Sequence, residues 1–211
     1  VLDQHIPLKW VSFRSAATMC VFFWFYFLIL RLHNGQAYEV PLTWLDRWVV
    51  FTPYSLPVYI SLWVYVSLAP AFLNRLRTLI NFGTWIALMC MACLVFFWMV
   101  PTRVPEFGVD WSQHPAMGII KGIDAGGNAF PSLHVASAIF SARWLDLSLR
   151  QANAPPWSLG LNWIYCAAIA WSTLASLQHV WLDVLSGALV GWLFCEVSIR
   201  REKAKQISGG P

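Results

Sequence analysis

Six long apolar segments, almost free of charged residues, constrain the fold of this chain more than any other feature of its sequence. A helix needs about 20 mostly apolar residues to cross the hydrocarbon core of a bilayer, and it satisfies its own backbone hydrogen bonds there. The sequence therefore predicts an all-α integral membrane protein, a bundle of six transmembrane helices. The predicted spans are residues 16–32, 50–69, 79–100, 131–149, 157–177 and 179–199.

The composition agrees with a membrane protein and argues against a soluble one. Of the 211 residues, 58% are hydrophobic and only 11% are charged, whereas a soluble domain has about 25% charged residues. The 14 tryptophans suit the headgroup level of a bilayer, where amphipathic rings gather. The net charge of +4 is small and the basic residues are scattered, so we expect no nucleic-acid partner.

We expect a single membrane domain over residues 1–211. Residues 1–15 are predicted to lie at the cytoplasmic interface, 16–199 to form the six-span catalytic core, and 200–211 to form a basic cytoplasmic tail. The first apolar segment has no small-residue cleavage site, so we expect a retained helix rather than a signal peptide. The chain starts at Val1 rather than Met, which fits a trimmed chain or part of a longer protein.

The basic residues predict the orientation of the bundle, because cytoplasmic loops carry an excess of Lys and Arg. Six spans place both termini on one side, where ten basic residues fall, against four on the other side. We therefore expect cytoplasmic termini. Loop 101–130 and the starts of the fourth and sixth spans would then share the outer face. That face is the periplasmic or exterior side of a bacterial inner membrane, or an organelle lumen in a eukaryote.

The stretch 126–137 carries the first chemical motif. It reads Gly-Gly-Asn-Ala-Phe-Pro-Ser-Leu-His-Val-Ala-Ser, with Pro131 predicted to open a helix and Ser132 and His134 in its first turn. The N–H groups of a helix start bind anions, and a histidine placed there can donate or accept a proton. Because the stretch lies among membrane spans, we expect a cradle for a lipid phosphate. A histidine here on its own would more often be an interfacial residue.

His179 and Asp183 form the second motif. They are four residues apart at the predicted start of the sixth span, so they share one face. A carboxylate inside the membrane is costly and points to a functional site. Asp183 is expected to bond one ring nitrogen of His179 and leave the other free for nucleophilic attack. The alternative is a buried hydrogen bond that only ties helices together. With His134 on the same face, the set is typical of phosphoryl transfer.

Together the two motifs resemble the type-2 phosphatidic acid phosphatase superfamily. Pro-Ser-Leu-His at 131–134 and His-x-x-x-Asp at 179–183, set in six spans, are similar to its Pro-Ser-Gly-His and His-x-x-x-Asp motifs. The resemblance implies that His179 is the nucleophile and forms a phosphohistidine, and that Asp183 orients it. It also implies that His134 protonates the leaving oxygen and that Ser132 bonds a phosphate oxygen.

Three departures from the superfamily pattern point to one of its branches. Leu133 replaces a glycine, and Ser172-Thr173 stands where the family has Ser-Arg, so a phosphate-binding arginine is missing. The segment 101–105, Pro-Thr-Arg-Val-Pro, stands in place of a Lys/Arg-Pro motif. Pro-Ser-Leu-His-x-Ala at 131–136, Gln-His-x-x-x-Asp at 178–183 and Pro-Thr-x-x-Pro at 101–105 are more similar to the branch of inositol phosphorylceramide and sphingomyelin synthases, which are lipid phosphotransferases.

The missing arginine leaves the bound anion short of positive charge, so other groups are expected to bind it. The two basic residues of the long outer loop are candidate substitutes, although both could instead anchor the loop at the headgroups. The remaining candidates are backbone N–H groups of the glycine-rich stretch and one residue adjacent to the nucleophile. The phosphate-binding candidates are thus Arg103, Lys121, Gly126, Gly127, Asn128 and Gln178, beside Ser132. Asp110, His114 and Asp124 are expected to serve loop solvation.

We expect neither a metal nor a cofactor. Zinc is the main rival chemistry, because His134, His179 and Asp183 are all legitimate ligands. However, the sequence has no His-x3-His pair or close cysteine, and the glycine-rich start favours phosphate. The five cysteines, including the pair Cys90 and Cys93, lie in apolar runs and are expected to be small packing residues.

The function predicted first is a membrane lipid-phosphate phosphatase with a phosphohistidine intermediate, acting at the outer leaflet. Its partners would be the bilayer and a lipid phosphate. The first alternative is a lipid phosphotransferase that hands the phospho-headgroup to an alcohol acceptor. The second is a non-catalytic lipid-binding membrane protein, for which the missing arginine is the only support. The sequence leaves the lipid headgroup, its tail and the oligomeric state open.

Overall fold

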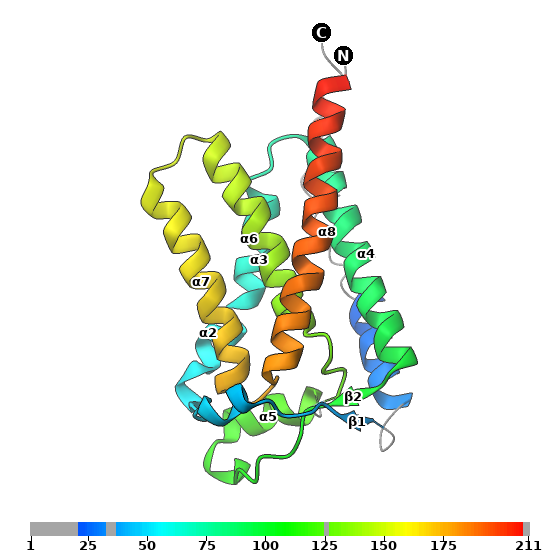
Figure 1. The fold of residues 1–211 in the computed structure, drawn as a ribbon, viewed down its shortest axis with the longest axis vertical. Helices are drawn as coiled ribbons and strands as arrows, with labels where there is room; N and C mark the ends of the chain where they lie inside the picture. Colours follow the sequence, from blue (N-terminus) through cyan, green and yellow to red (C-terminus); the bar gives the residue numbers. More distant parts are fainter. Residues whose placement is uncertain (1–20, 33–36, 125–126, 209–211) are drawn as a thin grey trace.

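The computed structural model describes residues 21–32, 37–124 and 127–208, and most of them are helical. Long helices stand side by side, and one end of the bundle carries the short strands and α5 (Figure 1). The elements are Val21–Leu32, β1 Tyr38–Glu39, η1 Trp44–Trp48, η2 Pro53–Ser55, α2 Leu56–Ile60, α3 Leu62–Ala71, α4 Leu76–Met99, β2 Thr102–Arg103, η3 Trp111–Gln113, α5 Pro115–Asp124, α6 Leu133–Gln151, α7 Pro156–Ala175 and α8 Trp181–Ser208. The predicted interfacial segment 1–15 and Gly126 lie outside the described residues.

Among the described residues, three helical stretches are long and apolar enough to cross a membrane: Pro53–Ala71, Leu76–Met99 and Trp181–Lys205. Val21–Leu32 is a shorter apolar helix. α6 carries several charged residues and α7 is rich in tryptophan and serine, which lowers their hydropathy. The mainly helical membrane class is therefore confirmed, whereas the count of six spans stays a prediction.

The long helices turn large apolar side chains outward. Val95 and Trp98 of α4 and Leu189 and Leu193 of α8 are among the exposed ones. Monomeric soluble proteins rarely expose contiguous apolar faces of this kind. In a bilayer the same side chains contact acyl chains, so the exposed surface fits a lipid environment.

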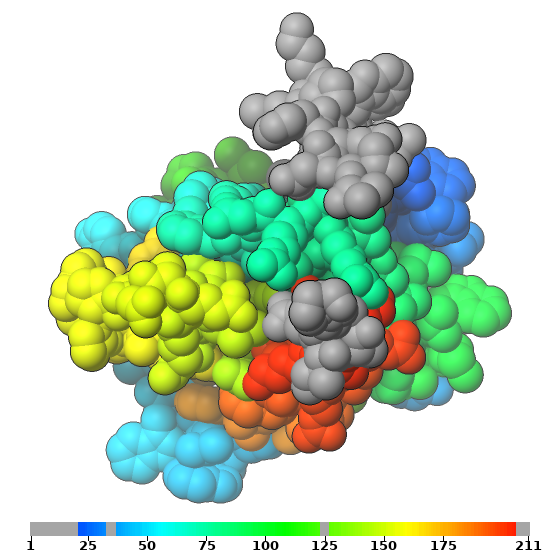
Figure 2. All heavy atoms as spheres, turned by 90° about the horizontal axis from the view of Figure 1, so that it is seen from above, coloured from blue at the N-terminus to red at the C-terminus, as the bar shows by residue number. Residues whose placement is uncertain are grey.

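α6 is the central helix, packed against α3, α7 and α8. Seen along the bundle in Figure 2, the end of α8 (red) lies against the start of α4 (teal). α8 approaches α6 closely at Gly187 and Gly191, where an added Cβ would overlap the carbonyl oxygens of Ser132 and Ala136. Two glycines four residues apart let helix backbones approach closely in membrane proteins. This contact brings the starts of α6 and α8 together.

The outer loop is more ordered than the sequence predicts. β1 and β2 form a parallel two-stranded sheet, which the all-α prediction did not include. The segment 101–130 contains β2, η3 and the helix α5. Two helix starts were also placed too early: α6 begins at Leu133 with Ser132 as its N-cap, and α8 begins at Trp181. Pro131 therefore precedes the N-cap instead of opening the helix.

Candidate active site

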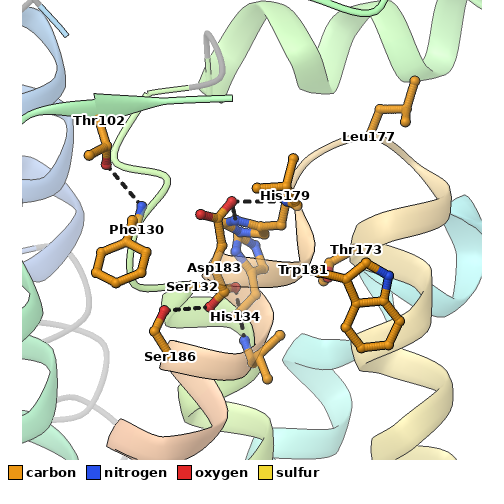
Figure 3. Close-up of polar contacts among 12 residues, drawn as sticks. Thr102, Phe130, Ser132, His134, Thr173, Leu177, His179, Trp181, Asp183 and Ser186 are labelled. Atoms are coloured by element: carbon orange, nitrogen blue, oxygen red, sulfur yellow. Dashed lines mark hydrogen bonds and ion pairs between the residues drawn. The ribbon is translucent and has the colours of Figure 1, made fainter. Parts of the chain in front are cut away.

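His134 and His179 meet where the starts of α6 and α8 come together. The backbone N–H of Ser132 donates to the carbonyl of Asp183 at 3.0 Å, which joins the two helix starts. The imidazole centroids of the two histidines lie 5.6 Å apart. Figure 3 shows His134, His179 and Asp183 gathered between these two helices. Two rings at this separation can both contact one tetrahedral group, so the structure brings together the residues of the two motifs.

His179 is held from one side by Asp183. Nδ1 of the ring lies 3.3 Å from Oδ2 of Asp183, and the same oxygen accepts the backbone N–H of Val180 at 2.9 Å. Asp183 is completely buried and His179 is 5% exposed. Nε2 of His179 and Oδ1 of Asp183 have no hydrogen-bond partner among the described residues. The carboxylate thus fixes the ring and leaves Nε2 unengaged, the arrangement that a nucleophilic imidazole needs.

The turn between α7 and α8 sets the position of His179. The carbonyl of Thr173 accepts the backbone N–H groups of Gln178 and His179 at 3.0 and 3.1 Å. Ser172 and Thr173 are fully buried, and their hydroxyls donate to carbonyls of α7. At the positions where the resemblance leads one to expect Ser-Arg, the chain therefore has two buried hydroxyls that bond back into α7, and the Thr173 carbonyl holds the turn.

Gln178 is a buried amide without a partner. It is 2% exposed, and neither its Oε1 nor its Nε2 has a hydrogen-bond partner within the described part of the chain. Leaving a buried polar group unsatisfied costs about 1–3 kcal/mol. Gln178 directly precedes His179 in the chain, so the turn before α8 carries two buried side chains with unpaired polar atoms.

Tyr59, which the sequence analysis missed, contacts the second histidine. Its hydroxyl lies 2.9 Å from Nε2 of His134, and the two rings are 4.9 Å apart, centroid to centroid. The tyrosine lies in α2, 75 positions before His134. It stands in an apolar run with no local motif, so only the fold reveals its place beside the histidine.

Two further residues fix the loops around the site. Asp46 in η1 accepts the backbone N–H of Trp181 through Oδ1 at 2.8 Å and so caps the start of α8. Lys121 in α5 donates from Nζ to the carbonyl of Leu177 at 2.9 Å. Lys121 therefore reaches the turn that carries Gln178 and His179.

Arg103 has a different environment from Lys121. Its guanidinium pairs with Glu39 at 2.7 Å, and both side chains are about half exposed, at 48% and 51%. Its backbone forms an isolated antiparallel bridge with Gly127. Among the contacts that the structure describes, Arg103 joins the loop to β1 and does not touch the histidine pair.

β2 holds the glycine-rich stretch in front of α6. The hydroxyl of Thr102 accepts the backbone N–H of Phe130 at 2.9 Å, and its carbonyl accepts that of Ala129 at 3.3 Å. Asn128 has a positive φ of 51° and donates its amide to the carbonyl of Tyr26 at 3.3 Å. The stretch is thus anchored on both sides, and the Asn128 side chain is used for that anchoring. Ser132 accepts the N–H of Val135 through its hydroxyl at 3.3 Å, as an N-cap.

The remaining polar residues of the outer loop serve its structure. Asp110 caps η3, and hydrogen bonds from the side chains of Ser112 and Gln113 lower the pKa of its carboxyl below the usual value. His114 packs its ring against Phe51, with centroids 5.1 Å apart. Asp124 ends α5, and its side chain lies outside the described residues. For Asp110 and His114 these contacts fit the predicted role in the loop.

A metal site does not emerge from the geometry. Over the described residues, no group of three or more His, Cys, Asp or Glu side chains is placed to hold a metal ion. The cysteines Cys90, Cys93, Cys166 and Cys195 are free. The described site offers two imidazoles and one carboxylate.

Comparison with known proteins gives one match. The model of the family described as the PAP2 superfamily matches residues 83–206, which include both histidines, Asp183, all of α6 and most of α8. No curated protein and no solved structure matches the chain.

Proposed function

We propose that this chain, which belongs to the PAP2 superfamily, is a membrane-embedded phosphatase. It would remove phosphate from a lipid through a phosphohistidine on His179. Superfamily membership supports a phosphatase or phosphotransferase activity. The assignment of His179 rests on one observation, the different surroundings of its two ring nitrogens. Nδ1 faces the buried Asp183 at 3.3 Å, and Nε2 has no partner among the described residues.

The proposed reaction has two displacement steps. Nε2 of His179 attacks phosphorus in line, an N–P bond forms and the P–O ester bond breaks. His134 gives a proton to the departing alcohol oxygen. Water then attacks phosphorus, the N–P bond breaks and His134 takes the proton from water. Asp183 stabilises the positive charge of the His179 ring in the first step.

Several groups would bind the phosphate oxygens. The starts of α6 and α8 both point their positive dipole ends toward the histidines, and such helix ends favour anions. Lys121 adds a full positive charge from α5, and Gln178 adds an amide donor. These groups are proposed to replace the arginine that is absent at Thr173. Gly127 and Asn128 are proposed to shape the approach to this anion site.

A lipid phosphotransferase is the second candidate, and the burial of the site favours it. His179 is 5% exposed and Gln178 is 2% exposed. A site that excludes water protects a reactive phosphoryl intermediate from hydrolysis. An alcohol acceptor that diffuses within the membrane would then take the phosphoryl group in place of water. A non-catalytic lipid-binding protein is the third candidate, and its only support is that Thr173 stands where the superfamily pattern has an arginine.

One assay separates the three candidates. The purified protein is mixed with phosphatidic acid carrying a radiolabelled phosphate, with and without a diacylglycerol whose acyl chains are shorter than those of the donor, so that the product of a transfer separates from the substrate. A phosphatase releases inorganic phosphate, a transferase makes newly labelled lipid that depends on the acceptor, and a carrier does neither. His179→Ala is expected to lower the rate by at least about a thousandfold, in the range seen for catalytic nucleophiles. His114→Ala, in the outer loop, is the matched control. Less than a tenfold loss in His179→Ala would refute the nucleophile assignment.

We also propose the placement of the protein in its membrane. The excess of Lys and Arg on the side of the termini supports cytoplasmic ends and an active site at the outer leaflet. In a bacterial inner membrane, this site would face the periplasm or the exterior. A lipid phosphate would then reach the histidines from within the bilayer, between the helices.

A further inference from the structure

A second polar site lies at the end of the bundle opposite to the histidines. Arg201 follows Trp181, the first residue of α8, by a helical rise of roughly 30 Å at about 1.5 Å per residue. The hydrocarbon core of a bilayer is also about 30 Å thick. When the histidines lie at one headgroup layer, the end of α8 around Arg201 therefore reaches the other.

A hollow of about 300 Å³ opens there between the start of α4 and the end of α8, the two segments that lie together in Figure 2. Three cationic side chains line it: Arg77, Arg201 and Lys205. Leu76 and Ile80 add apolar walls, and no acidic residue belongs to the described lining. The hollow therefore combines concentrated positive charge with an apolar flank.

Contacts between α4 and α8 hold the walls of the hollow together. The guanidinium of Arg201 lies over the ring of Trp85, 4.9 Å from its centroid, a cation–π contact that restricts the arginine. Asn81, a buried residue of the lining, donates its amide to the carbonyl of Ser198 at 3.0 Å and joins α4 to α8. The two walls are thus joined beside the hollow, and Arg201 needs less ordering when an anion binds.

We propose that this hollow binds the phosphate headgroup of an anionic phospholipid in the leaflet opposite to the histidine site. A free phosphate would use the same cations, so the phosphate group is the shared chemistry. The exposed Leu76 and Ile80 favour the lipid, because they offer the acyl chains a surface beside the headgroup. Basic pockets at the ends of transmembrane helices bind anionic headgroups in this way. This lipid is distinct from the proposed substrate, whose site lies a membrane thickness away.

Lipid retention by the purified full chain tests the proposal. The protein is equilibrated in detergent with phosphatidylglycerol or phosphatidylcholine, and bound lipid is counted by native mass spectrometry. The variant Arg77→Gln/Arg201→Gln/Lys205→Gln is expected to lose phosphatidylglycerol at least about fivefold relative to the wild type. The matched control, Arg75→Gln/Arg200→Gln/Lys203→Gln, removes the same charge from the same segments outside the hollow and is expected to keep it. Arg201→Gln alone is a milder variant with an intermediate loss expected.

Four results would overturn the proposal. The first is an equal loss in both triple variants, which indicates diffuse surface charge. The second is equal retention of phosphatidylglycerol and phosphatidylcholine by the wild type. The third comes from a competition arm with deuterated phosphatidylglycerol, in which millimolar inorganic phosphate displaces the bound lipid as well as undeuterated phosphatidylglycerol does, which makes a soluble anion the occupant. Unchanged retention in the triple variant of the hollow, with its fold intact, also contradicts the site.

Discussion

The two ring nitrogens of His179 have different surroundings, and this difference is the basis of the proposed chemistry. Nδ1 is tied to a carboxylate that also caps the start of α8, so Asp183 cannot turn away without losing the bond from Val180. Nε2 has no partner in the described structure. Asp183 thus bonds both the start of α8 and the ring of His179, the proposed nucleophile, which accounts for an acid buried at this helix start.

Tyr59→Phe is expected to lower kcat about threefold to tenfold with little change in KM. The phenol bonds Nε2 of His134 at 2.9 Å, and a typical hydrogen bond contributes about 0.5–1.5 kcal/mol. Tyr54→Phe is the matched control, because Tyr54 is 91% exposed. Steady-state kinetics on phosphatidic acid measures both variants. A Tyr59→Phe enzyme indistinguishable from Tyr54→Phe would show that the contact does not position His134.

Lys121→Gln and Arg103→Gln are expected to differ, although the sequence offers both as substitutes for the missing arginine. Lys121 reaches the turn beside His179, so its loss is expected to raise KM about tenfold, since hydrogen bonds to charged groups contribute about 1.5–3 kcal/mol. Arg103 forms an exposed pair with Glu39, which is expected to be worth little. The KM of Arg103→Gln should therefore stay within about twofold of the wild-type value. A larger increase of KM in Arg103→Gln than in Lys121→Gln would instead make Arg103 the substitute for the missing arginine.

At the scale of secondary structure, two glycines of α8 decide how close the histidines come. Gly187 and Gly191 lie under carbonyl oxygens of α6, and this close approach joins the helix starts. The small-x3-small spacing is visible in the sequence, so this contact could have been predicted. The capping of α8 by Asp46 could not, because η1 is 135 positions away and no local pattern links them.

Gly187→Ala is expected to destabilise the protein by about 1–3 kcal/mol, the usual cost of overpacking, and to lower activity by separating α6 from α8. Its added methyl group would meet the Ser132 carbonyl. Gly160→Ala in α7 is the control, because an added Cβ there meets nothing within 4 Å. The control is expected to be neutral or slightly stabilising, by up to about 1 kcal/mol. Thermal unfolding followed by tryptophan fluorescence measures both variants, and equal stability would contradict the close contact.

At the scale of the whole molecule, the sequence predicts the helical membrane class and the meeting of two remote motifs. The apolar runs and the residues 131–134 and 179–183 carry that information, because both are local patterns. The β1–β2 pair and the Tyr59–His134 contact were missed, since each joins segments more than 60 positions apart without a pattern of its own. The sequence offers Arg103 and Lys121 alike as candidate phosphate-binding residues, and only the structure shows that Arg103 pairs with Glu39.

The orientation of the bundle can be tested with cysteine labelling. In a variant without the five native cysteines, Ser112→Cys marks the outer loop and Ala152→Cys marks the turn between α6 and α7. Both positions are exposed. A membrane-impermeant maleimide is expected to label Ser112→Cys in right-side-out vesicles and Ala152→Cys only in inverted ones. Labelling of both positions from the same side would contradict a membrane crossing by α6.

The covalent intermediate tests the central claim most directly. Purified protein is mixed with radiolabelled phosphatidic acid, quenched in base within milliseconds to seconds, digested and read by mass spectrometry. The account predicts an acid-labile, base-stable phosphoryl group on His179 that disappears in His179→Ala. Phosphate on another residue would contradict the account. Substrate turnover without any phosphorylated protein, in a variant in which hydrolysis of the phosphohistidine is slowed, would also contradict it.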